Sequence, residues 1–194
     1  MARRSLLRFL LFFIIGFAYS LPAASDSVPR HGLMIGMAVD SYTDFGTYGT
    51  IQTGAFLEYG YSPFDRQLSE LRYPYIDVSA GLRTGITFES LRSFSVAFSP
   101  RLFPFAVPFT VMLRPGLILA KWLGASVFLD GGANIVFYRG ISPYLLFSFS
   151  GGLALSFYFS PVIGIRIDAG WGLWGRDRDY WKGPVARAGV VVKL

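Results

Sequence analysis

The sequence predicts an all-β fold: a transmembrane, antiparallel, up-and-down β-barrel of eight strands that follows an N-terminal signal peptide. Three observations lead to this prediction. Of the 194 residues, 53% are hydrophobic and only 15% are charged, whereas soluble domains carry about 25% charge. Apolar and polar residues alternate along most of the chain, and the alternating segments are longer than the strands of soluble proteins. Ten strands is the alternative count.

The composition excludes several classes of protein. The chain has no cysteine, which excludes a disulfide scaffold, a thiolate metal site and the lipid-modified cysteine of a lipoprotein. The formal net charge is +6, but Arg3, Arg4 and Arg8 lie in the expected leader and account for three of these charges. No run of Lys and Arg remains, so no nucleic-acid partner is expected.

Residues 1–20 are expected to form a signal peptide. Three arginines precede a short apolar core, Phe9–Phe17. The small residues Ala18 and Ser20 come just before the expected cut. The latest alternative cut site is after Ala24. Residues 21–30 would then form a short segment before the barrel, which occupies residues 31–194. The alternative is an uncleaved anchor helix, for which the apolar core is too short.

The residues after the leader alternate with a period of two, which is typical of β-strands. Between Tyr75 and Phe88 the even positions are mostly apolar, whereas the odd positions include Asp77 and Arg83. Nine candidate segments follow this reasoning: 31–41, 49–61, 74–89, 92–102, 106–119, 123–138, 144–159, 162–174 and 184–194. Because 92–102 is irregular and ends among prolines, we assign it to a long external loop, which leaves eight strands.

The charges indicate which face of each strand meets lipid. In a membrane barrel apolar residues face lipid, while charged and small residues fill the lumen. About eleven residues span the roughly 25 Å apolar band at a tilt near 40°, and several segments are at least that long. The lumen charges predicted in this way are Glu58, Asp77, Arg83, Arg114, Asp130, Arg166, Asp168 and Arg187.

A helical inner-membrane protein is the strongest competing interpretation. Gly140–Ile165 contains no charge and is long enough to cross a membrane as a helix. Its alternation of Phe and Ser, together with Gly151, Gly152 and Pro161, favours strands instead, because a lipid-facing helix has no reason to keep a period of two.

The lengths of the connections predict the orientation of the barrel. Short connections are expected at Ala120–Leu123 and Ser160–Pro161, and longer polar ones at Asp40–Thr50, Tyr61–Tyr73, Arg139–Pro143 and Gly175–Pro184. Short turns face the periplasm in such barrels, and long loops face outward. We therefore expect the last two long connections outside the cell, and Ser160–Pro161 and the C-terminus in the periplasm.

Signal peptide, alternating strands, aromatic strand ends and a terminal strand, Ala186–Leu194, together make the chain resemble small bacterial outer-membrane β-barrels of the OmpA/OmpX/OmpW type. The resemblance covers nearly the whole mature chain and implies outer-membrane lipids as surroundings. It also implies the barrel-assembly machinery as a partner during biogenesis. The final strand departs from the family's pattern in ending on Leu194, where an aromatic residue is typical.

The lumen charges allow two functional interpretations. The lumen charges could line a narrow path for small solutes, or they could form a plug of paired charges; an eight-stranded barrel is only wide enough for its side chains to fill, which favours the plug. A non-enzymatic protein, structural or surface-interacting, is therefore expected, with no cofactor or metal and with its solute or ligand unknown. A lipid-modifying or proteolytic enzyme is the alternative, but the single histidine, His31, has no evident catalytic partner.

Aromatic residues cluster near the last external connection. They are Trp171, Trp174, Tyr180 and Trp181, and charged residues surround them. We interpret this group as part of an aromatic girdle at the membrane interface beside a solvated loop tip. The nearby Gly170, Gly172 and Gly175 are expected to relieve crowding or curve the sheet.

Overall fold

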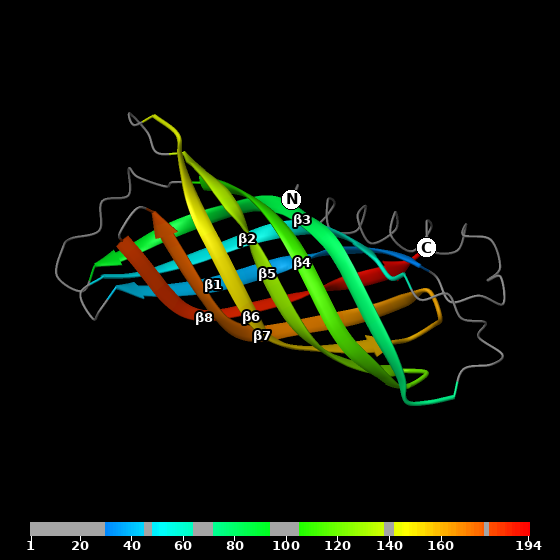
Figure 1. Cartoon of the computed structure of the whole chain (residues 1–194). Coiled ribbons are helices and arrows are strands. Elements are labelled where there is room, and N and C mark those ends of the chain that lie inside the picture. Colours follow the sequence, from blue (N-terminus) through cyan, green and yellow to red (C-terminus); the bar gives the residue numbers. More distant parts are fainter. Residues whose placement is uncertain (1–29, 45–47, 64–71, 94–104, 138–141, 177–178) are drawn as a thin grey trace, which may run out of the picture.

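The computed structural model describes residues 30–44, 48–63, 72–93, 105–137, 142–176 and 179–194. These ranges form eight antiparallel strands in a closed barrel, each paired with the next in the chain and the last with the first (Figure 1). The prediction of eight strands is confirmed. The strands are β1 (His31–Asp44), β2 (Tyr48–Tyr61), β3 (Tyr75–Ser93), β4 (Phe105–Ala120), β5 (Leu123–Phe137), β6 (Tyr144–Tyr158), β7 (Ile163–Arg176) and β8 (Asp179–Lys193).

The charge-free stretch that suited a helical membrane protein forms β6 and the start of β7, so the helical interpretation is wrong. Among the described residues, no helix has the length and apolar character needed to cross a bilayer. The predicted leader, residues 1–20, and nearly all of the segment 21–30 lie outside the described residues.

The strands extend further than the sequence predicts. β7 runs to Arg176 and β8 begins at Asp179, so most of the connection expected at Gly175–Pro184 is strand. Likewise, β1 runs to Asp44 and β2 begins at Tyr48, so most of the connection expected at Asp40–Thr50 is strand. Strands that rise above the apolar band into water can carry polar residues on both faces, so composition alone makes them resemble loops.

The two ends of the barrel differ, and we name them by what they carry. The terminal end holds Arg30, Leu194, the described parts of the β2–β3 connection (62–63 and 72–74), the β4–β5 turn (121–122) and the β6–β7 turn (159–162). The loop end is the end at which β1, β3, β5 and β7 finish and β2, β4, β6 and β8 begin. β1 and β8 meet in register along the seam that closes the barrel, where the Leu194 amide donates a hydrogen bond of 2.8 Å to the His31 carbonyl.

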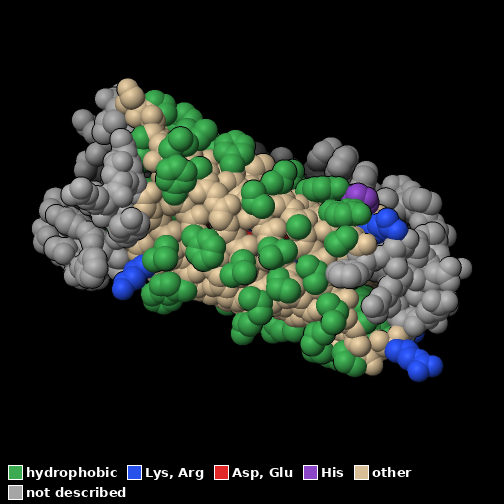
Figure 2. Space-filling model, viewed as in Figure 1, with side chains coloured by type: hydrophobic (Ala, Val, Ile, Leu, Met, Phe, Trp, Pro, Cys, Tyr) green, Lys and Arg blue, Asp and Glu red, His purple; other side chains and the backbone are tan. Residues whose placement is uncertain are grey.

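The wall is apolar outside, and its inner face carries buried charges among apolar side chains. Phe147 and Leu153 are 64% and 67% exposed, whereas Asp130 and Asp168 are 1% and 0% exposed. Figure 2 shows hydrophobic side chains spread over the visible wall, with Lys and Arg at its two ends. This arrangement inverts that of a soluble protein and matches a barrel whose outer face meets hydrocarbon.

Candidate functional site: a charged plug across the lumen

Six strands place charged side chains at inward positions near the middle of the barrel. The alternation of β2, β3, β4, β5, β7 and β8 turns these residues into the lumen, where the wall shields them from lipid. Each is less than 9% exposed. The residues, which we call the plug charges, are Glu58, Arg83, Arg114, Asp130, Arg166, Asp168 and Arg187.

Half of the plug is a closed ring of four charges. Arg166 donates a hydrogen bond from Nη2 to Glu58 Oε1 and another of 3.0 Å from Nε to Asp168 Oδ1. Arg114 Nη2 lies 3.3 Å from Glu58 Oε2 and 2.9 Å from Asp168 Oδ2. Two guanidinium groups therefore alternate with two carboxylates, an arrangement that compensates each buried charge.

The other half gathers around Asp130. Arg83 Nη2 and Arg187 Nη1 lie 2.9 Å and 2.5 Å from Asp130 Oδ2, and Arg187 also donates a hydrogen bond of 2.9 Å to Ser150 Oγ. The second Arg83 nitrogen, Nη1, lies 3.9 Å from Glu58 Oε2. This contact joins the two halves into one network.

An aromatic ring lies between the two halves. The Cζ atoms of Arg114 and Arg187 are each 5.3 Å from the centroid of the Phe128 ring, which is 0% exposed. The Nε and Nη1 atoms of Arg114 are buried without a hydrogen-bond partner in the described part of the chain. The face of Phe128 offers this cation an electrostatic partner in place of the missing acceptors. Phe56 similarly lies under Arg83, at 5.8 Å.

Sequence reasoning assigned no role to Phe128. It shares the even positions of β5 with Ser126 and Asp130, so the parity that located the charges also places this ring in the lumen. A large apolar residue among polar ones on an inward face is the signal that could have identified it.

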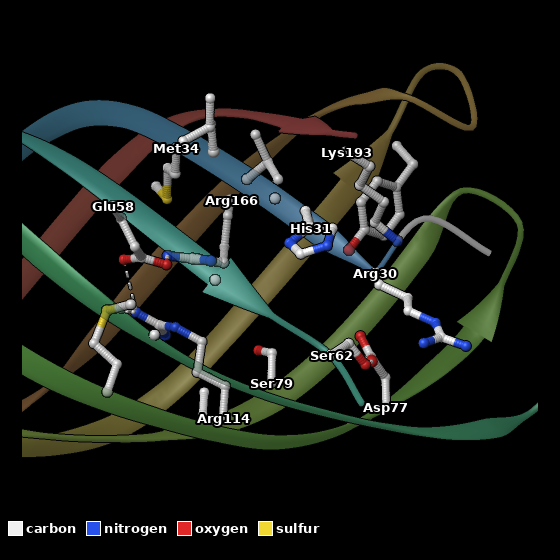
Figure 3. A pocket seen from close by; sticks show the side chains of 18 residues that line it. Arg30, His31, Met34, Glu58, Ser62, Asp77, Ser79, Arg114, Arg166 and Lys193 are labelled. Atoms are coloured by element: carbon white, nitrogen blue, oxygen red, sulfur yellow. Dashed lines mark hydrogen bonds and ion pairs between the residues drawn. The ribbon is translucent and has the colours of Figure 1, made fainter. Parts of the chain in front are cut away.

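Asp77 shares the inward face of β3 but lies toward the terminal end, away from the ring of charges (Figure 3). Its Oδ1 accepts a hydrogen bond of 2.8 Å from Ser62 Oγ. The structure thus brings together seven of the eight lumen charges selected from the sequence and places the eighth nearer the mouth.

The plug separates two cavities. The cavity toward the terminal end, about 90 Å³, is lined by Glu58, Arg114 and Arg166 (Figure 3). The cavity toward the loop end, about 40 Å³, is lined by Arg83 and Asp130, among others. The two cavities have no lining residue in common, so the plug charges meet a small polar space on either side.

The aromatic residues near the loop end divide between the two faces. Trp171 is 56% exposed and faces outward, as expected of a girdle residue. Trp174 is 5% exposed and packs in the lumen with Phe128 and Val185, and Trp181 packs against the same cluster. Trp174 and Trp181 therefore close the lumen, because they continue the inward parities of Asp168 and Arg187. The side chain of Tyr180 lies outside the described residues.

Gly172 makes the position of Trp174 possible. A Cβ atom at residue 172 would lie 2.1 Å from the Trp174 ring, and one at residue 170 would lie 2.2 Å from the Gly151 carbonyl oxygen. Both glycines therefore allow a close approach within the wall.

His31 lies at the terminal end, on the outer surface. Its Nδ1 is 2.6 Å from the Tyr59 hydroxyl, and its ring also contacts that of Tyr61. A catalytic role required His31 beside an acid or hydroxyl near the outer rim. The Tyr59 hydroxyl lies beside it, but at the end of the barrel that carries the termini and not at the loop end. Among the described residues, no group of three or more His, Cys, Asp and Glu could hold a metal ion.

No protein-family model and no curated protein matches the chain. Solved structures do. Neisserial surface protein A is similar with a TM-score of 0.59 at 10% identity, over 84% of this chain and 97% of that one. Ail, the attachment invasion locus protein of Yersinia pestis, is similar with a TM-score of 0.51 at 17% identity, over 86% and 99%. Ail in complex with the heparin analogue sucrose octasulfate gives 0.55 at 16% identity, over the same shares. The chain is thus an eight-stranded β-barrel with the architecture of the small bacterial outer-membrane barrels.

Proposed function

We propose that this protein is a closed outer-membrane barrel that acts through its loop end, as a structural or surface-interacting protein, and conducts no solute. The observation that carries the proposal is the plug. Four arginines and three carboxylates are buried across the lumen around Phe128. Removing one member of a buried ion pair costs about 3–5 kcal/mol, so the plug resists opening.

The cavities support the same proposal. At about 90 and 40 Å³, they have room for about three water molecules and about one, since a water occupies about 30 Å³ in the liquid. A permeation path needs continuous polar space from one mouth to the other. Here the plug charges and the ring of Phe128 lie between two small spaces with different walls.

Conductance of the refolded protein in planar bilayers tests the closed barrel. We expect no stepwise conductance above that of the lipid alone. A shift in gel mobility on heating, measured on the same preparation, shows that the protein is folded. Regular ohmic steps from a folded preparation would replace the closed barrel with a narrow conduit.

The surface-interacting role draws on the loop end and on the solved barrels of the same fold. Neisserial surface protein A is named as a surface protein, and Ail was solved with a heparin analogue. For this chain we propose only that the loop end faces outward and meets a surface ligand. Immobilising the folded protein through its terminal end and measuring binding of glycans and host proteins tests this role. A preparation that binds none of them would leave the structural role.

The route to the membrane completes the proposal. Residues 1–20 would direct export and be removed, with Ala24 as the latest cut, and the barrel-assembly machinery would insert the barrel 31–194. N-terminal sequencing of the protein recovered from the outer-membrane fraction tests the cut. An N-terminus at Met1 would favour the anchor helix instead.

A further inference from the structure

A third and larger cavity opens at the rim of the terminal end. We call it the rim pocket and define it by Tyr73, Tyr75, Lys121, Trp122, Phe159 and Lys193. Its volume is about 380 Å³, which lies within the range of about 300–1,000 Å³ that small-molecule sites occupy. Its lining comes from the β4–β5 and β6–β7 turns, from Tyr73 just before β3 and Tyr75 at its start, and from Lys193, the last residue of β8.

The charge of the rim pocket has one sign. Lys121 and Lys193 line it, and none of the described residues that line it carries a carboxylate side chain. The Lys193 ammonium lies 4.1 Å from the centroid of the Tyr158 ring, which also lines the pocket. Two ammonium groups with no carboxylate among the described lining residues favour an anionic occupant.

Most of the other lining residues are aromatic, and two of them, Trp122 and Phe159, lie where the lipid-facing surface ends. Trp122 is 58% exposed and Phe159 is 71% exposed. Leu119, 41% exposed on the outer face of β4, comes two residues before Lys121. Aromatic residues with neighbouring lysines at the end of an apolar wall mark the membrane–water interface. An occupant at this level has acyl chains on one side and water on the other.

We propose that the rim pocket binds an anionic phospholipid, whose headgroup phosphate contacts Lys121 and Lys193 and whose glycerol and first acyl carbons pack against Trp122 and Phe159. The inference rests on the membrane placement proposed above and goes beyond it, because it assigns one lipid class to one site. Lipid that only coats the wall would show no preference for headgroup charge.

Native mass spectrometry of the folded full chain, offered equal amounts of phosphatidylglycerol and phosphatidylcholine, tests the preference. Because each Lys near an anionic lipid surface contributes about a fivefold preference, we expect phosphatidylglycerol to be retained roughly ten- to thirtyfold over phosphatidylcholine. The double variant Lys121→Gln/Lys193→Gln should reduce this ratio to near one. Lys182→Gln, which removes an exposed lysine at the opposite end, is the matched control and should leave the ratio unchanged.

Trp122 gives a second measurement that needs no lysine variant. It is the one tryptophan of the four in the sequence that stands in the terminal-end turns. The fluorescence of Trp122 is obtained as the difference between the unsubstituted protein and Trp122→Phe. We expect brominated phosphatidylglycerol to quench this difference more than brominated phosphatidylcholine does. This comparison tests the preference for phosphatidylglycerol even if the double lysine variant does not fold.

Equal retention of the two lipids and equal quenching by them, in a protein that folds normally, would overturn the proposal that the rim pocket binds an anionic phospholipid. The proposal of a closed barrel would stand. An equal loss of preference in Lys182→Gln would also overturn it, because the effect would then come from net charge. A protein that fails to enter bilayers of either lipid would contradict the proposed membrane function itself.

Discussion

Glu58 on β2 accepts a hydrogen bond from Arg166 on β7, although 108 residues separate the two in sequence. β2 and β7 are not neighbours in the barrel, since β1 and β8 lie between them. The contact therefore crosses the lumen. Arg114 on β4 reaches Asp168 on β7 in the same way, so that charges on separated walls brace one another.

Loss of Arg166 tests this bracing. Arg166→Met leaves Glu58 and Asp168 with less positive charge around them, and we expect the free energy of unfolding to fall by about 3–5 kcal/mol. The urea midpoint in detergent micelles measures it. Arg72→Met, at an exposed position, should change the midpoint little. An unaltered midpoint in Arg166→Met would count against the plug.

The double variant Arg166→Met/Asp168→Asn should cost less than the worse of the two single changes. Arg166 Nε and Asp168 Oδ1 are 3.0 Å apart, and removing both leaves no charge of that pair without its partner. Unfolding free energies of the two single variants and the double variant complete the cycle. Additive losses would show that the two residues act independently.

Phe128→Ala should destabilise the barrel much more than Phe147→Ala. Both changes remove the same atoms, but Phe128 is 0% exposed between two arginines, whereas Phe147 is 64% exposed toward lipid. Truncating a buried Phe costs about 3–5 kcal/mol, and the two guanidinium groups also lose their aromatic partner. Denaturant midpoints compared in one lipid or detergent provide the measurement. Equal losses at the two positions would remove Phe128 from the plug.

Single arginine substitutions separate the lipid face from the lumen. Ile165→Arg and Phe147→Arg place a charge against hydrocarbon, at a cost of roughly 2–4 kcal/mol near the middle of the membrane. Ser148→Arg points into the loop-end cavity instead. The folded fraction after insertion into vesicles, read from heat-modifiable mobility, should be lower for the first two. Better folding of Phe147→Arg than of Ser148→Arg would reverse the assignment of the faces.

Cysteine labelling tests the orientation, since the natural sequence contains no cysteine. A membrane-impermeant maleimide added to intact cells should react with a Lys182→Cys protein and leave a Ser160→Cys protein unmodified until the cells are lysed. Residue 182 stands near the loop end and residue 160 in a turn of the terminal end. Labelling of position 160 alone in intact cells would place the termini outside.

The sequence predicts which residues face into the lumen better than it predicts the contacts between their side chains. Parity located the inward charges because a charge facing lipid is costly within the apolar band of the membrane. Parity does not predict which charges form ion pairs. The contact between Glu58 and Arg166 depends on the width of the lumen and on the length of the arginine side chain. Trp174 was assigned to the girdle because aromatic residues suit both faces near the interface, although its even position in β7 already matched Asp168.

The pairing of β1 with β8 completes the wall and also the plug. Arg187, which pairs with Asp130, is carried by the last barrel strand to be synthesised. Until that strand docks on β1, Asp130 lacks one of its two arginines and the interior remains open along one side. Water can then solvate the charges while the wall assembles, and the final hydrogen bonds expel it as the counter-charge arrives. We therefore expect closure of the wall and drying of the interior to occur together, so that the assembling barrel does not expose unpaired ions to hydrocarbon.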